Sequence, residues 1–315
     1  MKIPTIKEIK AAADRIGPSI HNTPVLTSTA INQMVGADVF FKCDNFQKCG
    51  AFKIRGATNT VLLMAQSADP PTAVATHSSG NHAAAVALAA KSQGMQAYVV
   101  MPNDAPTVKQ AAVAGYGAEI ILCEPTLAAR EAGLEQVVAR TGAAFIHPFN
   151  DERVIAGQGT AALEFLDQVA ELDVLMTPVG GGGLLSGTAL AVSALAPATR
   201  VLAGEPELAD DAYRSVQAGK LIPVGQTTTI ADGLRTSLGD LTFAIIQEHV
   251  EQIITVSEDE IVQAMRHIWE RMKIIVEPSC AVPFAALLKN REQFRGQRVG
   301  IIITGGNVDL AMLPF

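Results

Sequence analysis

Short apolar runs alternate along the chain with longer segments in which apolar residues recur every three or four positions. The short runs are typical of buried strands and the longer periodic segments of amphipathic helices. The predicted strands are 39–42, 73–76, 97–101, 119–123, 174–178, 200–204, 252–256 and 299–304. The predicted helices are 55–65, 81–93, 127–141, 155–171, 184–195, 258–272 and 280–289. This alternation predicts an α/β fold with mainly parallel sheets.

Two helices carry a recognisable start. Residues 1–17 predict a helix in which Thr5 and Glu8 are spaced as a capping box, before an apolar face of Ile6, Ile9, Ala13 and Ile16. Ser257 and Glu260 have the same spacing and predict a second capping box.

Two breaks divide the pattern, one at Asp69–Thr72 and the other at Pro148–Asp151. Proline-rich and polar breaks of this kind are typical of connections between structural units. They predict a small domain of residues 70–150, inserted into a larger domain made of residues 1–69 and 151–315.

Composition narrows the function classes. The chain has 315 residues, of which 49% are hydrophobic and 17% charged, and its formal net charge is −7. These values argue against disorder, and the scattered basic residues argue against binding to nucleic acid or an anionic membrane. Residues 179–198 lack charge but open with four glycines, so a buried βα unit explains them better than a membrane span.

Cysteine use points to a reducing compartment. Cys43, Cys49, Cys123 and Cys280 form no CxxC pair, which indicates reduced thiols in a cytoplasmic protein. Charges interrupt any apolar run among the first residues, so no signal peptide is expected.

Lys53 is a candidate for covalent chemistry, although a single lysine is usually a solvated surface group. It stands between Phe52 and Ile54, just ahead of a predicted helix. Burial lowers the pKa of an ammonium group, and a neutral amine is the form that makes a Schiff base.

Gly180–Gly183 follow a predicted strand and open a predicted helix. Glycines allow close backbone approach, and a helix N-terminus offers free N–H groups to a phosphate. A dinucleotide fingerprint is the weaker alternative, with Glu205 on the ribose, because Ser186 stands where the third glycine belongs. No Walker lysine follows, which excludes a P-loop.

Two further polar groups follow predicted strands. Ser78-Ser79-Gly80-Asn81-His82 is consistent either with a helix N-cap or with a carboxylate-binding loop, and His82 alternatively is a buried structural histidine. Thr304-Gly305-Gly306-Asn307 predicts a turn whose glycines let a flat ring approach, with the Thr304 hydroxyl at the ring edge.

Taken together, these motifs resemble those of pyridoxal-phosphate enzymes of fold type II, over essentially the whole chain. The resemblance is greatest to the group of serine racemases, threo-3-hydroxyaspartate dehydratases and threonine-serine dehydratases. It implies a tryptophan synthase β-like fold, with two open, twisted parallel sheets flanked by helices. The cofactor residues that it implies are Phe52, Lys53 as the covalent anchor, Asn81 on the pyridine hydroxyl, Gly180, Gly181, Gly182, Gly183 and Leu184 on the phosphate side, and Thr304 on the ring nitrogen. Most racemase-like relatives have serine at this last position, so Thr304 is a departure that keeps the hydroxyl.

The resemblance also implies a substrate site and a metal site. The substrate residues are Ser78, Ser79, Gly80, Asn81, His82 and Arg130, with Ser79 as a second acid–base group in racemases. Glu205, the Ala209 carbonyl and Asp211 match a site for Mg²⁺, Ca²⁺ or Mn²⁺, although two surface acids are the simpler interpretation without the resemblance.

The activity that the resemblance implies is a dehydratase (ammonia-lyase) acting on 3-hydroxyaspartate, serine or threonine. Lys53 removes the α-proton, and the product is a keto acid with ammonia. Arg130 and Arg235 are candidates for a second substrate carboxylate, with a surface role equally open for Arg235. A serine racemase with dehydratase side activity is the first alternative, and an NAD-dependent dehydrogenase or an inactive homologue are weaker ones. The expected partners are a small amino-acid substrate and a second copy of the chain in a homodimer.

Overall fold

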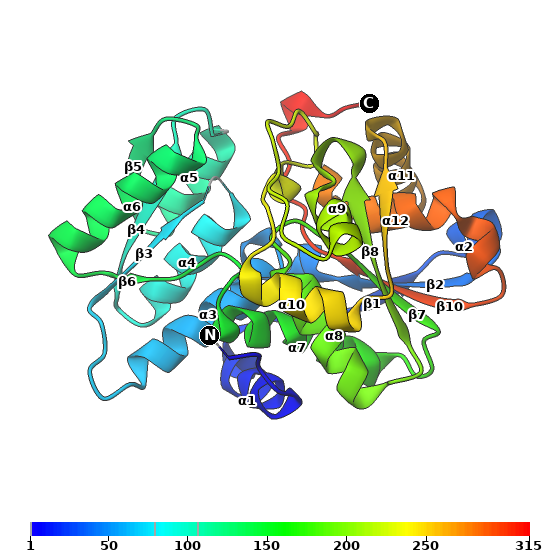
Figure 1. Ribbon diagram of the computed structural model, residues 1–315, viewed down its shortest axis with the longest axis horizontal. Helices are drawn as coiled ribbons and strands as arrows, with labels where there is room; N and C mark the ends of the chain where they lie inside the picture. Colours follow the sequence, from blue (N-terminus) through cyan, green and yellow to red (C-terminus); the bar gives the residue numbers. More distant parts are fainter. Residues whose placement is uncertain (1, 79, 106) are drawn as a thin grey trace.

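The computed structural model describes residues 2–78, 80–105 and 107–315, which form two sheets with helices on both faces (Figure 1). The larger sheet has six strands in the order β1-β2-β10-β7-β8-β9. Its strands are β1 (Val25–Thr27), β2 (Asp38–Cys43), β7 (Val174–Pro178), β8 (Arg200–Pro206), β9 (Gln252–Val256) and β10 (Arg298–Ile303). Only β1 and β2 pair antiparallel among these, and the other pairs are parallel.

Helices cover both faces of this sheet because successive side chains of a strand point to opposite faces. Ile301 and Ile303 of β10 join a core on one face, whereas Ile302 joins the core on the other. The first face packs against α2 (Thr29–Val35), α11 (Glu258–Met272) and α12 (Pro278–Lys289). The second face packs against α1 (Ile6–Ile16), α7 (Glu152–Gln168), α8 (Gly183–Leu195), α9 (Asp211–Ala218) and α10 (Asp240–His249).

The smaller sheet is entirely parallel, with the order β5-β4-β3-β6. Its strands are β3 (Ala73–His77), β4 (Gln96–Pro102), β5 (Glu119–Cys123) and β6 (Ala144–Phe145). One face packs against α3 (Lys53–Ala65), α4 (Asn81–Ser92) and α5 (Thr107–Gly115), and the other against α6 (Leu127–Thr141). This sheet and its helices lie beside the larger sheet, at the left of Figure 1.

The α/β architecture predicted from the sequence is confirmed, and both predicted capping boxes are present. The sequence analysis missed the short strands β1 and β6 and four helices: α2, α5, α9 and α10. The predicted helix 155–171 is three residues too far along. It begins at Glu152 because Asp151 caps it, accepting the N–H of Arg153 (2.8 Å), and it ends before Glu171, whose φ of +55° is not helical.

A buried ionic network fixes the start of α3. Arg55 has no exposed surface, and its guanidinium donates to both oxygens of Asp44 (2.6 and 2.8 Å) and to Glu164 of α7 (2.7 and 3.0 Å). The ammonium of Lys42 adds a further bond to Glu164 (2.8 Å). Charges this far from water are tolerated because each is paired and hydrogen-bonded.

The uncharged stretch 179–198 forms the end of the β7–α8 connection and the buried helix α8. Among the described residues, no helix has the length and apolar character needed to cross a membrane.

Candidate functional site

Lys53 is the first residue of α3, and the end of the last strand fixes its position. Phe52 donates its backbone N–H to the carbonyl of Thr304 (2.9 Å), and Ala51 forms an antiparallel bridge with Gly305. The Lys53 amine donates to the Pro148 carbonyl (3.0 Å) and lies 5.2 Å from the centroid of the Phe52 ring. Burial lowers the pKa of Lys53 to about 8, although the nearby Glu277 carboxylate acts in the opposite direction. The amine therefore faces the interior and is readily neutral, as a Schiff-base lysine requires.

The glycine run occupies the turn between β7 and α8. Gly182 has φ +85°, and α8 begins at Gly183, so free backbone N–H groups surround the turn. A Cβ atom at Gly181 would overlap the Phe149 ring, and one at Gly182 would approach Leu238 and Ile246 within 2.8 Å. Close backbone approach needs glycine here, and the result is a cradle for a phosphate.

Among the described residues of the loop after β3, no side chain caps α4. The residue before the helix is Gly80, and the Ser78 hydroxyl accepts the Gly80 N–H (3.3 Å). Ser79 lies outside the described residues. His82 is 2% exposed and neither ring nitrogen has a partner among the described residues, while burial holds its pKa well below the usual value.

One cavity of about 760 Å³ brings the predicted cofactor and substrate residues together. Parallel strands present their carboxyl ends at one sheet edge, and the loops after β3, β7 and β10 all reach this space. Its walls include Phe52, Lys53, Ser78, Gly80, Asn81, His82, Arg130, Gly180, Gly181, Gly182, Gly183, Leu184 and Thr304.

Two histidines in the same wall were missed by the sequence analysis. The Nδ1 atom of His147 accepts the backbone N–H groups of Phe149 (3.2 Å) and Asn150 (2.8 Å), so a neutral His147 carries its proton on Nε2. His77 at the end of β3 lies 6.4 Å from it, centroid to centroid. Burial lowers the pKa of each to about 4, which makes both rings neutral near pH 7. His147 follows the two-residue strand β6, too short for a pattern to reveal.

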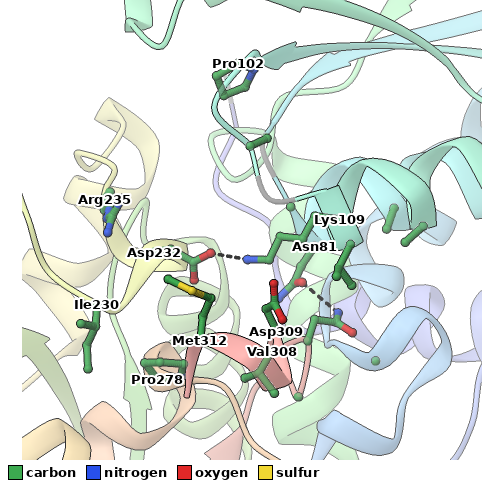
Figure 2. A pocket seen from close by; sticks show the side chains of 18 of the residues that line it. Asn81, Pro102, Lys109, Ile230, Asp232, Arg235, Pro278, Val308, Asp309 and Met312 are labelled. Carbon is green, nitrogen blue, oxygen red and sulfur yellow. Dashed lines mark hydrogen bonds and ion pairs between the residues drawn. The ribbon is translucent and has the colours of Figure 1, made fainter. Parts of the chain in front are cut away.

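Charged side chains also line the cavity. Lys109 of α5 pairs with Asp232, and both side chains line the cavity. A second cavity of about 830 Å³, drawn in Figure 2 with this ion pair, shares part of the wall, including Gly80, Asn81, Lys109 and Asp232. Glu277, 4% exposed, lies in the first cavity and was not singled out from the sequence.

Both arginines proposed for a second carboxylate line this space. Arg130 of α6 is partly buried, and among the described residues its guanidinium makes one hydrogen bond, a long one from Nε to the Thr126 carbonyl (3.5 Å). Arg235 is exposed and donates to the Thr229 carbonyl (2.9 Å from Nε). Arg130 therefore has more donor capacity left for a ligand.

Gly305 and Gly306 make room for neighbouring protein groups. A Cβ atom at Gly305 would lie 2.6 Å from the Glu277 carboxylate, and one at Gly306 would lie 2.7 Å from the Ile275 carbonyl. The approach of a flat ring to these glycines stays a prediction.

The metal candidates lie apart from both cavities. Glu205 at the end of β8 accepts the backbone N–H groups of Ala212 and Tyr213 (2.8 Å each), so its carboxylate points toward α9. Asp211 is 1% exposed, and neither of its carboxylate oxygens has a partner among the described residues. Burial raises the pKa of Glu205 to about 9 and that of Asp211 to about 7. The described parts of the chain contain no cluster of three or more His, Cys, Asp or Glu suited to a metal, so a cation here would need carbonyl ligands such as Ala209.

The cavity combines a buried amine that can form a Schiff base with a glycine turn that can hold a phosphate. Pyridoxal phosphate requires both groups. A family model described as pyridoxal-phosphate dependent enzyme matches residues 16–305. The chain belongs to this family.

A beta-hydroxyaspartate dehydratase of Paracoccus denitrificans (strain Pd 1222) is 52% identical over all of both chains. A serine racemase of Dictyostelium discoideum is 49% identical, covering 98% of this chain and 96% of the relative. The structure of maize serine racemase superimposes with a TM-score of 0.95 at 46% identity, covering 99% of this chain and 96% of the other.

Membership of the family supersedes the dehydrogenase alternative. For an enzyme of this family, a phosphate group of the cofactor is an alternative ligand for the glycine run that suggested a dinucleotide.

Proposed function

We propose that the protein is a dehydratase (ammonia-lyase) that converts 3-hydroxyaspartate into the corresponding 2-keto acid and ammonia, with serine and threonine as poorer substrates. The observation that carries the proposal is the presence of two arginines in the cavity wall. Arg130 and Arg235 line the same space as Lys53 and the glycine cradle, so the second carboxylate of a dicarboxylic substrate has a cationic partner in addition to the loop for the α-carboxylate. The 52% identity to a beta-hydroxyaspartate dehydratase supports the same choice.

Each group in the wall has a defined task in this proposal. Lys53, with its lowered pKa, anchors the cofactor and moves the α-proton. The cofactor supplies the electron sink that stabilises negative charge at the α-carbon. Ser78, Gly80, Asn81 and His82 form the loop for the α-carboxylate, which fixes the orientation of the Cα–H bond. Thr304 presents a neutral hydroxyl, which cannot hold the ring nitrogen protonated as a carboxylate would.

Substituting Arg130 by methionine tests the substrate class. We expect kcat/KM for 3-hydroxyaspartate to fall about 10- to 100-fold, the scale of a lost charged hydrogen bond, and kcat/KM for serine to stay within about threefold. Keto-acid formation from the stereoisomers of 3-hydroxyaspartate, serine and threonine supplies the measurement. Arg140→Met is the matched control, because Arg140 lies on the same helix, exposed and paired with Glu119. An equal loss with all substrates would contradict a role in recognising the second carboxylate.

Racemisation of serine is the second candidate activity, supported by the 46% identical racemase structure. Ser79 is the residue that we assign to protonation of the opposite face of the α-carbon. Ser79→Ala is therefore expected to suppress racemisation by at least about tenfold and to leave dehydration largely intact. Chiral chromatography of serine and keto-acid assays on one sample compare the two activities, and a parallel loss of both would argue against the assignment.

We also propose that Glu205, the Ala209 carbonyl and Asp211 bind Mg²⁺, Ca²⁺ or Mn²⁺. The two unpartnered oxygens of buried Asp211 support a hard cation, which prefers oxygen ligands. Adding Mg²⁺ at 100 times its dissociation constant is expected to stabilise the fold by about 2.7 kcal/mol. Thermal unfolding with and without the metal measures this shift. Asp211→Asn should abolish it and Asp210→Asn, on the neighbouring partly exposed residue, should not.

A further inference from the structure

Glu277 is a buried carboxylate in the cofactor cavity that no motif predicted. It stands directly before α12, is 4% exposed, and shares the cavity wall with Lys53, Asn81 and Thr304. A buried carboxylate of this kind requires hydrogen-bond donors, because an unpaired one is costly. Its side-chain donor is the amide of Asn81, whose Nδ2 lies 2.8 and 3.1 Å from its two oxygens, and the backbone of Asn307 supplies a further hydrogen bond.

The Asn81 amide is held at both ends. While its Nδ2 donates to Glu277, its Oδ1 accepts from Nδ2 of Asn307 (2.9 Å), which also donates to the Cys49 carbonyl (2.8 Å). Rotating the Asn81 amide by half a turn would place its oxygen against the carboxylate and its NH₂ against another NH₂. The network therefore permits one orientation of Asn81.

One N–H of Asn81 remains available to the cavity. The two N–H bonds of an amide diverge widely, whereas the two oxygens of one carboxylate lie close together, so a single carboxylate cannot satisfy both. The second N–H stays uncommitted in the cavity wall, where the ring of the family's cofactor is expected.

The surroundings of Glu277 favour this fixed arrangement. Gly305 leaves space for the carboxylate, and the backbone N–H of Glu277 donates to the Gly305 carbonyl (3.0 Å). The charged groups facing it are Asp232, Lys109 and Lys53. Burial and Asp232 raise the pKa of Glu277 to about 7, against the opposing effects of Lys109 and Asn81. A substantial fraction of Glu277 is therefore ionised near neutral pH, and the protonated form still keeps an acceptor oxygen.

We propose that Glu277 is a positioning residue, which holds the Asn81 amide so that an N–H, and never the carbonyl oxygen, faces the ring hydroxyl of bound pyridoxal phosphate. It acts through Asn81 and does not itself contact the reacting atoms. The inference depends on the family's cofactor and on Asn81 facing its ring, and it is independent of which amino acid is the substrate.

Two substitutions separate hydrogen bonding from mere packing. Glu277→Gln keeps an acceptor oxygen for Asn81, whereas Glu277→Leu keeps the bulk and removes the acceptor. The dissociation constant of pyridoxal phosphate, from absorbance titration of the apoprotein, is expected to rise about 10- to 100-fold in the leucine variant and to stay within about threefold in the glutamine variant. The visible absorption maximum of the bound cofactor should shift in the leucine variant, because the donor to the ring oxygen is lost.

A double-mutant cycle identifies the route of the effect. If Glu277 acts through Asn81, Glu277→Leu combined with Asn81→Ala should bind the cofactor no more weakly than Asn81→Ala alone. Glu258→Leu is the control, because Glu258 is a partly buried carboxylate outside both cavities that accepts the Ile230 N–H. It should change the thermal stability of the apoprotein without changing cofactor affinity.

Three results would overturn the proposal: unchanged cofactor affinity and absorption in Glu277→Leu, a loss in Glu277→Gln as large as in the leucine variant, or additive losses in the double mutant. If the leucine variant does not fold, Asn307→Ala provides a second test, because it removes the donor to Oδ1 of the same Asn81 amide. An unaltered absorption maximum and unaltered affinity in that variant would equally contradict the assignment.

Discussion

Lys53→Ala is expected to reduce keto-acid formation by about 10³-fold or more and to remove the visible absorption of the holoenzyme. The amine is buried and hydrogen-bonded to the Pro148 carbonyl, and its pKa is lowered to about 8, whereas Lys109 in the same wall is paired with Asp232. Borohydride reduction of the unmodified protein followed by peptide mass mapping should place the added mass at position 53.

The matched control is Lys7→Ala, on the exposed side of α1. It should retain both the absorption band and full turnover. Substantial activity in Lys53→Ala, or label recovered on another lysine, would contradict both the anchor and the site built around it.

Arg55→Met is expected to lower the free energy of unfolding by about 3–5 kcal/mol, because it leaves Asp44 and Glu164 without their shared guanidinium in the interior. Asp44 and Arg55 are both fully buried, so solvent cannot compensate for the loss. Urea denaturation of the apoprotein, followed by circular dichroism, measures the change.

Arg153→Met supplies the comparison for a partly exposed pair, since the Arg153 side chain is 34% exposed and pairs with Asp151. It should cost about 1 kcal/mol or less. Adding Asp44→Asn to Arg55→Met should recover part of the lost free energy of unfolding, because it removes the buried carboxylate charge that Arg55 no longer neutralises. Equal effects of Arg55→Met and Arg153→Met would show that the buried network contributes little.

The sequence predicted the parts of the fold that repeat a strong local pattern. β5, β7 and β9 and the helices α6 and α11 have the predicted limits, because long periodic runs or capping residues define them locally. β1 and β6 are two or three residues long and exist only because a neighbouring strand pairs with them. Their formation is a tertiary effect that a local pattern does not contain.

Some residues of the candidate site belong to local motifs that the sequence reveals, and others do not. Lys53, the glycine run and Thr304 belong to contiguous motifs, and the structure brings them to one cavity. His77, His147 and Glu277 are single residues in unremarkable contexts, and only the packing of distant segments places them there. The Asn81–Glu277 contact spans 196 positions in the chain, so no local spacing predicts it.

The bond between Phe52 and Thr304 has a consequence for how the protein is made. Lys53 is synthesised some 250 residues before the segment that fixes its position. A nascent chain that ends before β10 contains Lys53 but lacks the Thr304 carbonyl, which binds the backbone of the preceding residue. Cofactor binding that depends on this bond therefore requires the segment after β10, and deleting that segment would impair a residue some 250 positions away.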